Sequence, residues 1–153
     1  MKYLLTLFLF IASLSAGYKR YLLPDDYEQI IYLLRQKIEK SDLHVTIFSR
    51  RIAHYDIEKA LLRLARTTPV TLYLNTPQKR LALYKNIDIR LIRRPIATTI
   101  VQFDDTTACF FATPLEKKAM RDTIALFVCN DTDALAPLRP ILRSSKEYLQ
   151  EVK

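Results

Sequence analysis

Residues 43–75 switch from a β-prone pattern to a helical one and back, in the order strand, loop, helix, loop, strand. Residues 45–48 and 70–74 are short runs rich in β-branched and aromatic side chains. Between them, Asp56 stands where a helix N-cap belongs, ahead of four apolar residues at helical spacing: Ile57, Leu61, Leu64 and Ala65. Because a crossover of this length joins parallel strands, the segment predicts a β-α-β unit in a covered sheet.

The rest of the chain continues this alternation and predicts an α/β fold. A helix is expected over residues 25–40, with an apolar face made of Tyr27, Ile30, Ile31, Leu34 and Ile38. Further β-prone segments span residues 18–23, 89–92, 96–103, 107–112 and 124–129. A hairpin turn is expected at Asp104-Asp105-Thr106. A short helix is expected at residues 78–85, with Leu81, Leu83 and Tyr84 inward. Residues 114–121 are a charged helical or irregular crossing, and a final helical segment over residues 135–148 is interrupted by two prolines. We therefore predict a mixed, largely parallel sheet with helices on both faces.

The N-terminal residues are typical of an export signal. A positive residue precedes an apolar run over residues 3–14, and small residues follow it. The run is shorter than a membrane span usually needs, but Lys19 and Arg20 just beyond it also fit an uncleaved anchor. We divide the chain into a signal peptide or N-terminal anchor, residues 1–17, and one domain, residues 18–153. The protein is then periplasmic, or attached to the inner membrane through its N-terminus and facing the periplasm.

Composition excludes several classes of site. The single glycine, Gly17, lies in this leader, which excludes glycine-rich phosphate loops, dinucleotide fingerprints and G-x-S-x-G elbows. Two histidines and two cysteines are too few and too scattered for a zinc site of standard spacing, so we expect no metal and no cofactor. The net charge of +8 favours anionic partners such as nucleic acid, phosphate or lipid headgroups, although a solvated basic surface explains it nearly as well.

The order of elements resembles one half of the phospholipase D superfamily, closest to its small secreted bacterial endonucleases. Residues 43–49 and 57–61 are similar to a strand and the following helix of that family, and residues 84–89 to its strand leading to the active site. Residues 67–70 replace a family turn and lack its glycine. The resemblance covers residues 20–150 and implies a phospholipase D-like domain. Because family members with one half-site pair across the active site, it also implies a homodimer.

The catalytic motif of that family, H-x-K-x-x-x-x-D, is degenerate in this chain. In the family, the histidine attacks phosphorus and the lysine neutralises phosphate charge. With Asp105 in the place of the aspartate, Thr98 falls at the histidine position and Ile100 at the lysine position. No shift of the alignment restores the motif, because no histidine follows His54. The resemblance therefore predicts a pseudoenzyme.

Arginines flank the predicted strand ends where sites gather in open α/β sheets. The candidate phosphate-binding residues around this former phosphate cleft are Arg50, Arg51, His54, Arg93 and Arg94. Arginine is well shaped for bidentate contacts with phosphate. The alternative is that these are ordinary surface charges paired with nearby carboxylates. His54 is also the candidate base or nucleophile if a rearranged catalytic site exists.

Cys109 and Cys129 lie on two predicted neighbouring strands. In an exported chain such a pair often forms a disulfide, which would contribute on the order of 3 kcal/mol to stability. The alternative is two buried thiols, which are common in apolar strands.

Three functions follow from these observations. The first is an exported, non-catalytic phospholipase D-like protein that binds a phosphate-bearing polyanion such as DNA, or a protein partner in the envelope. The second is a divergent phosphodiesterase, acting on nucleic acid or phospholipid through His54. The third is a structural component of an envelope complex with an incidental positive surface. Salt-sensitive DNA binding separates the first from the third.

Overall fold

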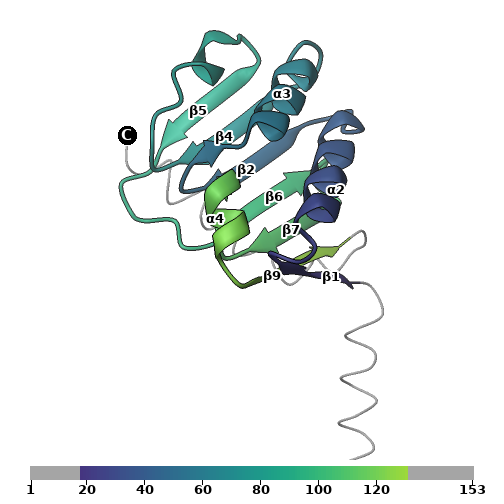
Figure 1. Ribbon diagram of the computed structural model, residues 1–153. Helices are drawn as coiled ribbons and strands as arrows, with labels where there is room; N and C mark the ends of the chain where they lie inside the picture. Colours follow the sequence, from purple (N-terminus) through teal and green to yellow (C-terminus); the bar gives the residue numbers. More distant parts are fainter. Residues whose placement is uncertain (1–17, 131–153) are drawn as a thin grey trace, which may run out of the picture.

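The computed structural model describes residues 18–130 of the chain. Its main feature is a seven-stranded sheet in the order β1-β9-β7-β6-β2-β4-β5 (Figure 1). The strands of this sheet are β1 (Tyr18–Leu23), β2 (Val45–Ser49), β4 (Val70–Leu74), β5 (Ile87–Leu91), β6 (Thr99–Phe103), β7 (Thr107–Phe111) and β9 (Ala125–Asn130). A second, two-stranded ladder joins β3 (Ile52–Ala53) to β8 (Leu115–Glu116). The helical elements are α2 (Tyr27–Glu39), α3 (Tyr55–Leu64), α4 (Lys117–Asp122) and the 3-10 turn η1 (Leu81–Leu83).

The sheet is mixed, as predicted, but it is not largely parallel. β2 pairs in parallel with β4, and β4 with β5, so residues 43–75 form the predicted β-α-β unit with α3 as the crossover. The other neighbours, from β2 through β6, β7 and β9 to β1, are all antiparallel. The prediction overestimated the parallel share because the sequence pattern identifies a strand but not its neighbours, and the pairings of β1 with β9, β9 with β7 and β6 with β2 join strands that are distant in sequence or separated by other elements.

The described helices lie against one face of the sheet (Figure 1). α2 packs beside α3 and buries the five residues predicted for its apolar face: Tyr27, Ile30, Ile31, Leu34 and Ile38. Inward-facing strand residues such as Ile47, Leu72 and Phe127 complete one core with them. Helices were expected on both faces, and the helical segment predicted at residues 135–148 lies outside the described residues. Among the described helices, none has the length and apolar character needed to cross a membrane.

Two local predictions about helix ends and inward residues were wrong. α3 begins at Tyr55 with His54 at the N-cap, so Asp56 lies in the first turn, where its charge still suits the helix dipole. Residues 78–85 form only the single turn η1. Leu81 is buried as predicted, but Leu83 is 83% exposed and Tyr84 is 40% exposed. A single 3-10 turn contains three residues, and only one side chain of η1 points into the core.

The hairpin between β6 and β7 turns at the predicted residues. Asp104 and Asp105 have positive φ angles of 48° and 58°, as the two central residues of a type I′ turn require. The Asp104 carboxylate also accepts hydrogen bonds from the backbone N–H groups of Asp42, Leu43 and His44, at 3.2, 3.0 and 3.0 Å. The hairpin is therefore tied to the loop that leads into β2, a role that the sequence pattern did not reveal.

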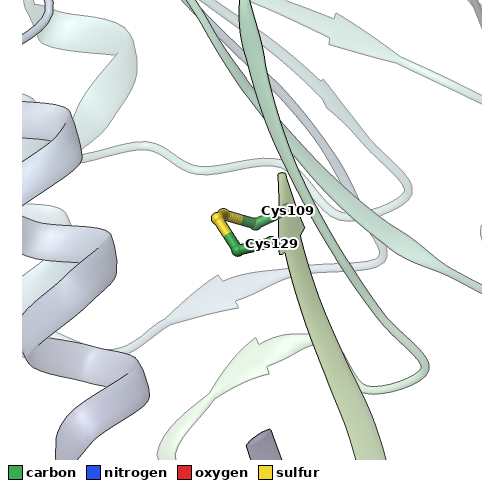
Figure 2. Close-up of a disulfide and its surroundings, with 2 residues drawn as sticks. All are labelled: Cys109 and Cys129. Atoms are coloured by element: carbon green, nitrogen blue, oxygen red, sulfur yellow. A yellow bond between two sulfur atoms is a disulfide. The ribbon is translucent and has the colours of Figure 1, made fainter. Parts of the chain in front are cut away.

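Cys109 and Cys129 are joined in a disulfide inside the core (Figure 2). They stand directly opposite each other in the antiparallel register of β7 and β9, and both are buried. Their side chains point to the sheet face that carries α2 (Figure 2). The disulfide thus links the two strands that connect the edge strand β1 to the centre of the sheet.

Candidate anion-binding site

A hollow of about 540 Å³ lies at the carboxyl ends of the parallel strands β2, β4 and β5. Its lining residues are Arg50, Asn75, Leu91, Ile92, Arg93 and Pro95. Arg50 follows β2 and Arg93 follows β5, so two of the four predicted arginines reach one hollow from different strand ends. Neither side chain forms an ion pair within residues 18–130. The hollow is therefore lined by two arginines that have no ion-pair partner among the described residues, beside the apolar residues Leu91, Ile92 and Pro95.

Asn75 shapes this hollow, and sequence reasoning treated it only as a turn residue. Its Nδ2 donates hydrogen bonds to the carbonyl oxygens of Ile92 at 2.8 Å and Arg94 at 2.7 Å. Its Oδ1 accepts a hydrogen bond from the backbone N–H of Ile96 at 2.8 Å. One side chain thus fastens the segment that carries Arg93 to the end of β4. Asn is favoured at turns, so the sequence identifies Asn75 as a turn residue. The segment that its side chain binds lies about 20 residues away, beyond the reach of a local pattern.

The other predicted members of the site lie elsewhere. Arg51 pairs with Glu116 at 3.1 Å, next to the β3–β8 ladder, because the neighbouring side chains of Arg50 and Arg51 point apart. Arg94 does not line the hollow, although its carbonyl oxygen is held by Asn75. Arg51 thus has a carboxylate partner, as the alternative interpretation of these arginines expects.

The residues at the degenerate motif positions do not form a cluster. Thr98 is exposed just before β6, and Ile100 packs beside Phe48 and Tyr73 on the sheet face away from the helices. Asp105 lies in the hairpin at the far end of β6, a strand of five residues or about 17 Å. There its carboxylate is 3.4 Å from Nε2 of His44 and accepts a hydrogen bond from Gln102. Asp105 is therefore too far from the hollow to act with its arginines.

The buried hydroxyl groups of Ser49 and Thr99 lie in the sheet between the two motif positions. Thr99 Oγ1 lies 3.0 Å from Ser49 Oγ and donates a hydrogen bond to the carbonyl oxygen of Thr113. Ser49 Oγ also accepts a hydrogen bond from the backbone N–H of Leu115. Ser49, Thr99 and Thr113 are all buried. These neutral groups link β2 and β6 to the segment that leads into β8. They carry no positive charge that could bind a phosphate.

His54 is buried, which corrects its prediction as a phosphate ligand at the arginine rim. Only 2% of its surface is exposed, and Nε2 lies 2.6 Å from the hydroxyl of Tyr27 on α2. Its Nδ1 is buried without a hydrogen-bond partner among the described residues. Arg121 of α4 stacks over the Tyr27 ring and pairs with Glu28. The ring of His54 thus joins α3 to α2 in the interior and does not reach the hollow.

The structure predicts that His54 makes stability depend on pH. Burial lowers the pKa of His54 below its ordinary value of 6.5, although the nearby Asp56 opposes the shift. Below pH 6.5 the unfolded chain therefore binds a proton that the folded chain does not, and the free energy of unfolding falls until the pH passes the folded pKa. Urea unfolding at several pH values should show this loss in the wild type and its reduction in His54→Gln. A His44→Gln control should keep the loss, and parallel curves for all three proteins would contradict the prediction.

The described residues contain no group of three or more histidine, cysteine, aspartate or glutamate side chains that could hold a metal ion.

Comparisons with solved structures identify the fold. NucT from Helicobacter pylori superposes with a TM-score of 0.69 and 20% identity, over 88% of this chain and 94% of that chain. Nuc from Salmonella typhimurium, a phospholipase D family member, gives a TM-score of 0.65 and 16% identity over 88% of this chain and 92% of its own. The archaeal chromatin protein TrmBL2 gives 0.60 and 11% identity, over 98% of this chain and 60% of its own. No protein-family model and no curated protein sequence matches the chain.

These likenesses confirm the predicted phospholipase D-type fold. Their identities, 20% or lower, carry the fold and not the activity. The function of the chain therefore depends on its own residues.

Proposed function

We propose that this chain, which has the phospholipase D fold, is a non-catalytic protein that binds a phosphate-bearing polyanion, with DNA first among them. The observation that carries the proposal is the convergence of Arg50 and Arg93 on one hollow, with no ion pair among the described residues. Guanidinium groups suit phosphate oxygens, which accept paired hydrogen bonds in the same plane. The net charge of +8 adds long-range attraction for a polyanion.

The residues at the motif positions do not support catalysis by the family's mechanism. Thr98 and Ile100 provide neither a nucleophilic imidazole nor a cation, and the buried threonine between them is committed to hydrogen bonds within the sheet. His54 is enclosed against Tyr27, so it has no path to a phosphorus atom. Binding without hydrolysis follows from these two facts together.

The choice of DNA among polyanions draws support from the fold comparisons. Among the similar structures, Nuc is described as a phospholipase D family member, and the TrmBL2 structure is described as showing a novel mode of DNA binding. The proposed location is outside the cytoplasm. The apolar leader supports this location, as does the disulfide, because disulfides persist in oxidising compartments. A homodimer is part of the proposal only through the family resemblance.

We expect Arg50→Ala with Arg93→Ala to weaken DNA binding strongly. Each arginine lost removes one phosphate contact, so affinity at low salt should fall by about 100-fold. The slope of log affinity against log salt should flatten by about 1.8 for duplex and about 1.4 for single-stranded DNA. The measurement is fluorescence anisotropy of labelled DNA across a salt series, with the same samples run on a gel to detect cleavage.

A matched control removes the same charge elsewhere. Arg66 and Lys85 are exposed near the amino ends of β4 and β5, opposite the hollow, so Arg66→Ala with Lys85→Ala should change affinity far less. Equal losses in both double variants would mean that net charge, and not the hollow, binds DNA. Cleavage that survives repurification and disappears in His54→Ala would overturn the non-catalytic assignment.

A further inference from the structure

Strands β1 and β9 present an exposed apolar surface on the sheet face away from the helices. Leu22 and Leu126 stand opposite each other in the antiparallel register and are 44% and 53% exposed. Ile124, two residues before Leu126, is 82% exposed. Their sequence neighbours Leu23, Ala125 and Phe127 are buried in the core, so the alternation of the strands turns Leu22 and Leu126 outward, and Ile124 lies exposed just before β9. We call Leu22, Ile124 and Leu126 the β1–β9 surface.

A cation lies beside this surface. Arg20 is exposed and shares the outward alternation with Leu22, two residues along β1. In the register it stands opposite Val128, which is partly buried next to Leu126. Within residues 18–130, Arg20 has no ion-pair partner. Clustered apolar side chains with a free cation at their border are typical of surfaces that contact a membrane interface.

The β1–β9 surface lies close in the sequence to the apolar N-terminal run, which indicates what the surface contacts. β1 begins at Tyr18, and only three residues, 15–17, separate it from the apolar run at residues 3–14. Leu22 is eight residues beyond Leu14, which is at most about 27 Å of extended chain. Any bilayer that takes up the apolar run therefore lies within reach of the β1–β9 surface.

We propose that the β1–β9 surface rests on an anionic lipid bilayer. Leu22, Ile124 and Leu126 enter the interface, and Arg20 contacts the lipid headgroups. The arginine hollow borders β5, at the opposite edge of the sheet from β1 (Figure 1). Six strand spacings separate these edges, about 29 Å, so a bilayer at β1 leaves the hollow open to a soluble polyanion. The proposal goes beyond the polyanion-binding function and does not depend on it.

The absence of tryptophan allows a direct test in the full chain. Leu126→Trp introduces one fluorophore in the β1–β9 surface, and Leu83→Trp introduces one in η1, beside β5. Vesicles of phosphatidylcholine and phosphatidylglycerol carry brominated acyl chains that quench tryptophan at the interface. We expect the emission of the Leu126→Trp protein to fall about twofold and that of the Leu83→Trp protein to stay unchanged. A protein held only by its leader would not show this difference between the two sites.

Three results would overturn the proposal. These are quenching at neither site, equal quenching at both sites, and an emission of Leu126→Trp that shifts with protein concentration when no vesicles are present. The last result would assign the surface to a second copy of the chain. If Leu126→Trp fails to fold, Ile124→Trp replaces it, because that side chain is 82% exposed and precedes the strand. Arg20→Glu should reduce quenching by anionic vesicles while DNA binding at the hollow persists.

Discussion

Reduction of the Cys109–Cys129 disulfide is expected to lower the free energy of unfolding by about 3 kcal/mol. The two cysteines are 20 residues apart, and closing a loop of that length restricts the unfolded chain by about this amount. Domains of this size are stable by only about 5–15 kcal/mol, so the disulfide supplies a large share of the total. The midpoint of urea unfolding should fall by about 1–2 M.

The loss of stability should appear first at the β1 edge of the sheet. β9 is the described neighbour of β1, and β9 joins the centre of the sheet through β7, the strand to which the disulfide links it. Without the covalent link, the β1–β9 pair depends on hydrogen bonds and on packing of side chains such as Phe127. Hydrogen exchange should therefore accelerate in β1 and β9 more than in the parallel strands β2 and β4.

The measurement compares urea unfolding with and without a reductant, after equilibration in the transition region, because the buried sulfur atoms react mainly once the chain opens. Cys109→Ala with Cys129→Ala is the matched control, and its midpoint should not respond to reductant. An identical midpoint for oxidised and reduced wild-type protein would contradict the prediction.

The sequence predicted well what depends on local periodicity. The β-α-β unit and the buried face of α2 follow from apolar spacing, which directly encodes the side of an element that faces the core. The hairpin follows from two consecutive aspartates, which tolerate positive φ better than most residues. The share of parallel pairs was overestimated because spacing identifies a strand and not its neighbours.

The candidate site was predicted less well, because it depends on contacts between distant segments. Nothing local distinguishes Arg50, which reaches the hollow, from Arg51, which turns to Glu116 on the β3–β8 ladder. His54 sits in a polar loop and looks exposed, but the Tyr27 hydroxyl from α2 accommodates its ring in the interior. The partner of His54 lies 27 residues away in the sequence, and the partner of Arg51 lies 65 residues away. A local sequence pattern does not encode contacts over these separations.

Asp104→Ala is expected to destabilise the fold by about 3 kcal/mol. The carboxylate accepts three backbone hydrogen bonds from the loop before β2, and no other side chain replaces it there among the described contacts. Hydrogen bonds to a charged acceptor stabilise a fold more than neutral ones. Their loss leaves three backbone N–H groups either bonded to water or without a partner. Alanine at a φ of 48° adds backbone strain to that loss.

Three further variants separate the hydrogen bonds from the backbone strain. Asp104→Gly accepts the positive φ but loses the carboxylate, so it should remain clearly destabilised. Asp104→Asn keeps an oxygen for Leu43 and His44, which both bond to Oδ1, and should recover most of the stability. Asp105→Ala carries a similar strain at a φ of 58° but anchors no backbone, so it should cost less than Asp104→Ala. If Asp104→Gly unfolds at the wild-type urea midpoint, the hairpin does not hold the entrance to β2, and Asp104 is only a turn residue.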